Sequence, residues 1–423
     1  MNTVFAPAAL SGTTAAPASK SEAHRRLICA GMADGTSEIA GFTASEDIEA
    51  TMRCLGALGA RVEVEGSTAR VTGFAEKPAL MPLFDCGESG STLRFFVPIA
   101  LTMTHGGIFR MRGRLGQRPM DVYRDLLVPK GVAWSMREGA DGTAELRVSG
   151  GMTPGHYTLP GNVSSQFVSG LLFVLPLQEM ESTLTVTPPV ESTAYIDMTL
   201  RAIRLSDVRV EEMGEGKWRI PGRQRYQTRK VALHGDWSQA AVLLTAGAIS
   251  GDVTVTGMSD DDGQGDRAII DCLRKLGADI ETGDGWVRCR KSELHGAELD
   301  MRNCPDIAPM VALACAVAEG ESRLTGCRRL RLKESDRLET TGAMLRTMGA
   351  GVRAEWDTLR VRGGRQLRGN LTVDARHDHR MVMLASIAAL AADGPVTVAD
   401  TDALAKSWPD YLDTYRALGG QAE

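Results

Sequence analysis

Residues 269–291 read IIDCLRKLGADIETGDGWVRCRK, and this stretch decides the fold. A helix-like apolar run ends at Gly277, and two further segments flank the turn Gly283-Asp284-Gly285. Glycine suits the end of a helix because it adopts the left-handed conformation without a Cβ penalty. The stretch therefore predicts a helix followed by a β-hairpin.

The same pattern recurs along the chain. Residues 50–73 and 342–364 repeat it most clearly, weaker copies surround Gly131 and Asp207, and a final copy near Gly419 lacks its hairpin. The six expected helix ends lie 70 to 76 residues apart, at positions 59, 131, 207, 277, 349 and 419. Spacing of this regularity indicates an internal repeat.

Each copy also contains a second, more apolar helix that is followed by glycine and a strand. These helices are expected to begin near Ser21, Gly90, Ser165, Ser238, Asp306 and His379. The repeating unit is then βαβαββ. Six units predict an α/β fold of two pseudo-symmetric domains with three repeats each, in which the helices are buried inside the sheets.

An aspartate stands near the start of each helix of the first kind: Asp47, Asp121, Asp197, Asp266, Asp336 and Asp410. A carboxylate at this position accepts hydrogen bonds from unpaired backbone N–H groups and complements the helix dipole. We therefore interpret the six aspartates as helix caps and not as catalytic groups.

Composition excludes several classes of protein. The 423 residues include 48 Lys and Arg against 53 Asp and Glu, a net charge of −5, which argues against nucleic-acid binding through bulk charge. No segment is long and apolar enough for a membrane span, and no signal peptide is recognisable. The eight cysteines form no CxxC pair and no zinc-type spacing, which predicts buried, reduced thiols in a cytoplasmic protein.

Cationic and hydroxyl side chains gather where the apolar helices begin. The N-terminus of a helix attracts anions, because its free N–H groups and partial positive charge face the ligand. Taken singly, each segment has a plain structural explanation as a cap, a tight turn or a solvated basic face. Taken together, they predict a site for polyanionic metabolites. The segments are SKSEAHR (19–25), GESGSTLR (87–94), GQRPMD (116–121), NVSSQF (162–167), RLKESDRL (331–338), DHRM (378–381) and KSWPDY (406–411).

These segments, together with STAYIDMTL (192–200) and CPDIAPM (304–310), resemble motifs of the EPSP synthase family, the 3-phosphoshikimate 1-carboxyvinyltransferases. The resemblance runs in order along nearly the whole chain. It implies two inside-out α/β domains of three repeats each, in agreement with the sixfold repeat. It also implies transfer of the enolpyruvyl group of phosphoenolpyruvate to the 5-hydroxyl of shikimate-3-phosphate, without metal or cofactor, by a monomer that binds no nucleic acid or membrane.

The resemblance implies roles for particular residues. The acid–base groups fall on Asp306 and Glu334, assisted by Lys20, His379 and Lys406. The shikimate-3-phosphate side comprises Lys20, Ser21, Arg25, Ser164, Ser165, Gln166, Ser192, Tyr195, Asp306 and Lys333. The phosphoenolpyruvate side comprises Lys20, Gly90, Arg118, Gln166, Arg337, Arg380 and Lys406.

The expected domains are residues 20–234, mainly for shikimate-3-phosphate, and residues 1–19 with 235–423, which carry the acid–base groups. Hinges are expected near 19–20 and 234–235. Three positions depart from the family's pattern, and none of them removes a catalytic group: Ala18, Glu88 and Arg329. Glu88 leaves the response to glyphosate-like inhibitors open.

Two other functions are weighed against this one. UDP-N-acetylglucosamine enolpyruvyl transferases share the fold, but they carry a cysteine in the loop before their Arg-Pro pair. The matching position here is Gly113, and no cysteine lies between Cys86 and Cys272. A non-catalytic repeat scaffold would keep the glycines but lose the acid–base pair, whereas Asp306 and Glu334 are both present.

Overall fold

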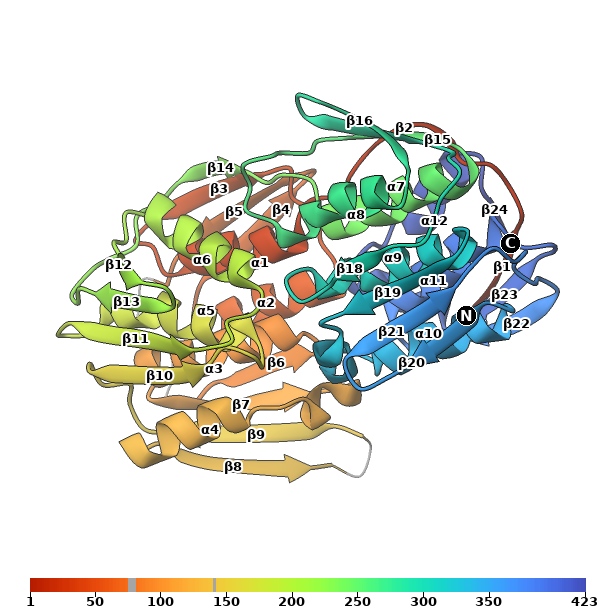
Figure 1. Ribbon diagram of the computed structural model, residues 1–423. Helices are drawn as coiled ribbons and strands as arrows, with labels where there is room; N and C mark the ends of the chain where they lie inside the picture. Colours follow the sequence, from red (N-terminus) through yellow and green to blue (C-terminus); the bar gives the residue numbers. More distant parts are fainter. Residues whose placement is uncertain (75–80, 140–141) are drawn as a thin grey trace. The chain divides into compact units, whose positions relative to one another are not determined.

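The computed structural model describes residues 1–74, 81–139 and 142–423 (Figure 1). Its contacts divide the chain into two compact units. The continuous unit is Ala18–Leu233, and the split unit combines Met1–Pro17 with His234–Glu423. The chain therefore passes between the units at residues 17–18 and 233–234, within two residues of the expected hinges.

One repeat in the continuous unit shows the pattern without interruption. Its elements are β6 (Leu83–Gly87), α3 (Gly90–Met103), β7 (Gly106–Met111), α4 (Asp121–Leu127), β8 (Ala133–Glu138) and β9 (Ala144–Ser149). The sheet has the order β6-β7-β9-β8, with β6 and β7 parallel and the other pairs antiparallel. This arrangement is the expected βαβαββ unit.

The other two repeats of the continuous unit build sheets of the same order. One contains β10 (His156–Pro160), α5 (Ser165–Val174), β11 (Ser182–Thr187), α6 (Thr193–Leu205), β12 (Glu211–Gly214) and β13 (Lys217–Ile220). The other contains α1 (Lys20–Gly31), β3 (Thr36–Ala40), α2 (Glu46–Ala57), β4 (Arg61–Glu65), β5 (Thr68–Thr72) and β14 (Lys230–Ala232). Its first strand, β14, comes from the far end of the unit and lies parallel to β3.

The split unit has three further repeats. The first comprises β2 (Ser11–Ala15), α7 (Trp237–Ser250), β15 (Asp252–Thr256), α8 (Ile269–Lys275), β16 (Asp279–Gly283) and β17 (Trp286–Arg290). The second comprises β18 (Glu298–Asp300), α9 (Ala308–Val317), β19 (Glu321–Thr325), α10 (Arg337–Thr347), β20 (Gly351–Ala354) and β21 (Thr358–Arg362). The third comprises β22 (Leu371–Asp374), α11 (His379–Ala389), β23 (Val396–Ala399), α12 (Tyr411–Ala417), β24 (Gln421–Ala422) and β1 (Asn2–Ala6).

The N-terminal segment completes two of these sheets. Strand β2 lies parallel to β15, and β1 lies between β23 and β24, as the red strands among green and blue ones in Figure 1 show. The expectation that the final repeat lacks its hairpin is confirmed, because only the two-residue strand β24 follows α12. Its last strand is β1, which is contributed from the other end of the chain.

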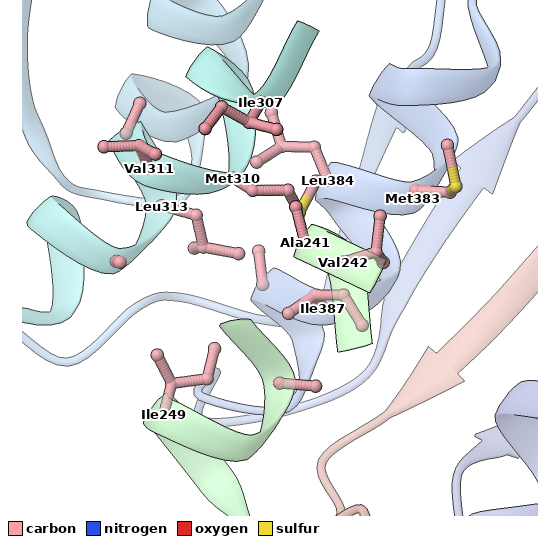
Figure 2. Packing of buried hydrophobic residues seen from close by; sticks show 14 of the residues in the cluster. Ala241, Val242, Ile249, Ile307, Met310, Val311, Leu313, Met383, Leu384 and Ile387 are labelled. Atoms are coloured by element: carbon pink, nitrogen blue, oxygen red, sulfur yellow. The ribbon is translucent and has the colours of Figure 1, made fainter. Parts of the chain in front are cut away.

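The helices that begin each repeat form the cores. In the split unit, α7, α9 and α11 are buried on almost every side and pack against one another through residues such as Val242, Met310 and Leu384 (Figure 2). Helices α1, α3 and α5 occupy the same position in the repeats of the continuous unit. The expectation of helices enclosed by sheets is confirmed.

The six predicted helix ends are confirmed. Gly59, Gly131, Asp207, Gly277, Gly349 and Gly419 all have left-handed φ angles, between +61° and +96°. The prediction of six aspartate caps is mostly wrong. Among these aspartates, only the Asp336 side chain accepts a capping hydrogen bond, from the Glu339 N–H. Asp47 lies in the first turn of α2, where its charge still faces the positive end of the helix dipole, whereas Asp197 is the fifth residue of α6 and lies beyond the first turn.

The eight cysteines are buried and unbridged. In the described part of the chain, no helix combines the length and the apolarity that a membrane span requires.

Candidate active site

Arg337 is the centre of a buried charge cluster in the split unit. Its side chain is 2% exposed, at the first position of α10. The guanidinium donates from Nε to Asp378 Oδ2 at 2.8 Å and from Nη1 to Asp306 Oδ1 at 2.9 Å, and Nη2 lies 2.6 Å from Glu334 Oε2. One arginine therefore holds three carboxylates, two of which are the expected acid–base pair.

Asp306 also binds a second cation. It lies in the single turn Pro305–Ile307 that precedes α9, and Lys333 Nζ donates to its Oδ1 at 2.9 Å. Burial disfavours the charged carboxylate, but Lys333, Arg380 and Arg337 outweigh burial and lower the pKa of Asp306. Burial also lowers the pKa of Lys333, and the charge of Asp306 opposes that effect. The pair thus combines an ionised carboxylate with an ammonium group that releases its proton more readily than usual.

The N-terminus of α11 contributes Arg380 to the same cluster. Arg380 Nε lies 3.9 Å from Asp306 Oδ1, and its Nη2 donates to Ser238 Oγ at the start of α7 at 2.8 Å. Asp378 caps α11 by accepting from the Arg380 N–H. The first turns of α7 and α11 and the turn that leads into α9 therefore meet at one place, where the helix dipoles attract anions.

His379 and Lys406 lie at the edge of this cluster. His379 Nδ1 is 4.0 Å from Asp378 Oδ1, and both residues are buried. Lys406, the last residue of the 3₁₀ helix Thr401–Lys406, donates to the backbone oxygen of His377 at 2.8 Å. His377 and Arg376 both have positive φ angles, so the chain makes an unfavourable turn immediately before α11.

In the continuous unit, Lys20 begins α1 and forms an ion pair with Asp47 of α2, with 2.6 Å between Nζ and Oδ2. Arg25 lies one turn further along α1 and is 2% exposed. Its guanidinium donates to Ser21 O, Thr199 Oγ1 and Tyr195 O, so it ties α1 to α6. Burial lowers the pKa of Arg25 to about 10.

Arg118 and Gly90 are adjacent. A Cβ atom on Gly90 would lie 2.6 Å from Arg118 Nη1, so only glycine lets the guanidinium rest against the start of α3. Gln166, in the first turn of α5, accepts from Arg94 at 2.7 Å and donates to Ser91 Oγ at 2.8 Å. Three of the four expected phosphoenolpyruvate residues of this unit, Gly90, Arg118 and Gln166, thus gather at the first turns of α3 and α5, and the fourth, Lys20, begins α1.

The remaining expected residues lie at helix starts of the same unit. Ser164 caps α5 by accepting from the Gln166 N–H, and Ser165 is the first residue of that helix. Ser192 precedes α6 with a left-handed φ of 55°, and Tyr195 lies in the first turn of α6. All the expected site residues therefore lie within the first two turns of a helix, directly before a helix, or in or next to a short 3₁₀ helix.

The structure also shows the surroundings of the three residues that depart from the family's pattern. Ala18 is the first residue of the continuous unit. The Glu88 carboxyl lies against Gly113, where a Cβ atom would come within 2.6 Å of it. Arg329 is buried and donates to the Arg302 backbone oxygen at 2.6 Å.

Several functional candidates were missed from the sequence. Asp378 directly precedes His379 and is wholly buried against Arg337, and Asp47 holds Lys20 instead of capping α2. Arg94 and Ser238 hold Gln166 and Arg380 in the same way. The position of Asp378 directly before a helix could have predicted a helix cap. It could not have predicted the bond to Arg337, which lies 41 residues away in the chain.

Within residues 1–74, 81–139 and 142–423, no group of three His, Cys, Asp or Glu side chains is arranged to hold a metal ion. Helix starts with arginine, lysine and hydroxyl groups, beside a carboxylate pair, define a class of protein. It is an α/β repeat protein of two units, each with helix starts suited to bind phosphate or carboxylate groups.

Comparison with known proteins specifies the class. The family model for EPSP synthase (3-phosphoshikimate 1-carboxyvinyltransferase) matches residues 4–415. The chain is 36% identical to the 3-phosphoshikimate 1-carboxyvinyltransferase of Clostridium novyi, over 99% of this chain and 98% of the relative. It is 34% identical to that of Clostridioides difficile, over 99% and 97%. The chain belongs to the EPSP synthase family.

Solved structures agree on the fold. An EPSP synthase from Acinetobacter baumannii matches with a TM-score of 0.81 and 25% identity, over 100% of this chain and 99% of that one. An enolpyruvyl transferase from Streptomyces tendae has the same fold, with a TM-score of 0.78 and 18% identity, over 100% and 98%.

Proposed function

We propose that the two clusters of helix starts carry out the reaction of this family. The protein is a 3-phosphoshikimate 1-carboxyvinyltransferase of the shikimate pathway, which leads to chorismate and the aromatic amino acids. It transfers the enolpyruvyl group of phosphoenolpyruvate to the 5-hydroxyl of shikimate-3-phosphate and releases phosphate. The observation that supports the proposed chemistry is the position of Asp306 among Lys333, Arg337 and Arg380.

The reaction proceeds by addition and then elimination. The hydroxyl oxygen bonds to C2 of phosphoenolpyruvate, the hydroxyl loses its proton, and C3 gains one. The tetrahedral adduct then loses phosphate from C2 and a proton from the new methyl group, which restores the double bond. Asp306 removes the hydroxyl proton, and Lys20 or Glu334 transfers protons at C3, with His379 and Lys406 assisting.

The cations that surround Asp306 tune its basicity. While Lys333 and Arg337 bind its Oδ1, its low pKa makes it a weak base. Substrate phosphate and carboxylate groups compete for Lys333, Arg337 and Arg380, and each cation they withdraw raises the pKa of Asp306. Substrate binding thus prepares the base.

The other proposed roles follow the two sides of the reaction. Ser21, Arg25, Ser164, Ser165, Ser192, Tyr195 and Lys333 bind shikimate-3-phosphate, while Gly90, Arg118, Arg337, Arg380 and Lys406 bind phosphoenolpyruvate. Lys20 and Gln166 contact both substrates. The chain crossings at residues 17–18 and 233–234 act as hinges, and the protein works as a monomer in the cytoplasm.

Asp306→Asn tests the role of the base. This variant keeps the shape of the side chain but cannot accept the proton, so kcat should fall by about 10²–10⁴-fold. The dissociation constant for shikimate-3-phosphate should change by less than about tenfold, a difference of about 1.4 kcal/mol. Phosphate release and isothermal titration measure the two quantities.

Asp336→Asn is the matched control, because asparagine also caps helices and Asp336 lies in the same segment as Lys333 and Arg337, which bind Asp306. Its turnover should stay near that of the wild type. Normal turnover in Asp306→Asn would refute the assigned base. A wild-type protein that binds shikimate-3-phosphate without releasing phosphate would instead be a scaffold, and phosphate release with UDP-N-acetylglucosamine would indicate the other transferase.

A further inference from the structure

Four buried polar side chains form a chain of hydrogen bonds inside the continuous unit. His24 Nδ1 lies 2.7 Å from Thr51 Oγ1, Thr51 Oγ1 lies 2.8 Å from Thr92 Oγ1, and Thr92 Oγ1 donates to Ser89 Oγ at 2.7 Å. All four residues are at most 2% exposed. Burying hydroxyl groups is costly unless they are hydrogen-bonded, and valine would fill either threonine position with the same shape.

Counting protons shows which group donates and which accepts in each hydrogen bond of this series. Each hydroxyl has one proton to donate. Because Thr92 donates to Ser89, Thr51 must donate to Thr92, and His24 must then donate from Nδ1 to Thr51. His24 Nε2 is then the unprotonated nitrogen of the ring, and no described residue forms a hydrogen bond with it. Burying an unprotonated ring nitrogen without a hydrogen bond costs less free energy than burying an N–H group without one.

The neutral state of His24 agrees with this direction. Burial, together with the charges of Lys20 and Arg25, lowers the pKa of His24 well below its usual value. A neutral imidazole carries a single proton, which here lies on Nδ1.

This series of hydrogen bonds connects the helices that carry Lys20 and Gly90, two proposed substrate contacts. His24 lies one turn after Lys20 on α1, and Thr51 lies one turn after Asp47 on α2, so the His24–Thr51 bond runs beside the Lys20–Asp47 ion pair. At the other end, Ser89 caps α3 by accepting from the Thr92 N–H, directly before Gly90. One polar chain therefore ties the start of α3 to the helix pair that carries Lys20.

We propose that His24, Thr51, Thr92 and Ser89 are positioning residues, which fix the start of α3 relative to α1 and α2 and thereby hold Gly90 and Lys20 in register for phosphoenolpyruvate. This inference rests on the proposed function. The four residues act through Gly90 and Lys20.

Thr92→Val removes the hydroxyl at the centre of the chain. The KM for phosphoenolpyruvate should rise about fivefold to tenfold, as expected for the loss of one hydrogen bond, with kcat changed less than about twofold. Thr92→Ser restores a hydroxyl and should recover the wild-type KM. Thr51→Val should behave like Thr92→Val, and the double variant should be little worse than either because the bonds form one unit.

Thr245→Val is the matched control. Thr245 is equally buried, in α7, and within the described residues its hydroxyl has no hydrogen-bond partner. This variant should leave both kinetic constants unchanged. An unchanged KM in Thr92→Val, with only a lower unfolding midpoint, would show that the chain is merely structural and would overturn the proposal.

The ¹⁵N signals of His24 test the proton direction in the wild-type protein, even if a variant fails to fold. A neutral ring with its proton on Nδ1 is expected, and a proton on Nε2 or a charged ring would overturn the proposal. Failure of the wild type to release phosphate would refute the proposed function instead, and the ring signals would still decide the chain's direction.

Discussion

Arg337 shows how a single residue organises chemistry from several segments. Its guanidinium reaches Asp378, Glu334 and Asp306, which lie in three separate parts of the chain. Breaking such a buried set by removing one charge is costly, because the others are left without compensation. The proposed acid–base pair, Asp306 and Glu334, is thus oriented by a residue that the motif alone presents as a substrate contact.

Gly90 gives a prediction at this scale. In Gly90→Ala, the new Cβ atom would lie 2.6 Å from Arg118 Nη1, and the flexible arginine must move because the helix backbone is fixed. The loss of one charge-assisted hydrogen bond raises the KM for phosphoenolpyruvate about 10- to 100-fold, while the far-ultraviolet circular dichroism stays unchanged. Steady-state kinetics check this.

The double variant Gly90→Ala/Arg118→Ala provides the control. If the alanine acts through Arg118, the double variant binds phosphoenolpyruvate no worse than Arg118→Ala alone. Additive losses would contradict that route.

At the scale of elements, the helix ends recur because backbone conformation requires them. In each of the six repeats, the second helix ends before a residue with a left-handed φ, and five of these six residues are glycine. Each left-handed residue reverses the chain into a hairpin or strand. The repeat is therefore marked by its turns more clearly than by its helices.

Substitutions at Gly131 and Gly56 distinguish the effect of backbone conformation on stability from the effect of side-chain packing. Both are exposed, and a Cβ atom on either would meet nothing within 4 Å, but Gly131 has a φ of +92° whereas Gly56 lies inside α2. Gly131→Ala should lower the free energy of unfolding by about 1 kcal/mol, and Gly56→Ala should raise it by about 0.5–1 kcal/mol. Urea unfolding of the full chain checks both signs, and shifts of the same sign would contradict the conformational explanation.

At the scale of the molecule, the two units differ in how they are assembled. The continuous unit, Ala18–Leu233, contains every strand of its three sheets. The split unit needs β1 and β2 from the first 17 residues to complete two of its sheets. Open edges with unpaired N–H and C=O groups would remain without those strands.

This difference predicts unequal independence. Residues 18–233, expressed alone, should fold and unfold cooperatively in urea, whereas residues 234–423 alone should not. Joining residues 1–17 after Glu423 through a short glycine–serine linker should restore cooperative unfolding, because it returns β1 and β2. Cooperative unfolding of residues 234–423 without that addition would show that the two strands are dispensable.

The sequence by itself determined the repeat, the left-handed helix ends at Gly277 and its counterparts, and the helix starts that carry Lys20, Gly90 and Asp306. These features depend on backbone preferences and side-chain periodicity within a few residues, so they can be recognised locally. The tertiary structure alone decided that β1 completes the last sheet, that Asp47 holds Lys20, and that Asp378 and Arg337 bind each other. These pairings join segments 27 to almost 400 residues apart, where no local preference of the chain selects the partner.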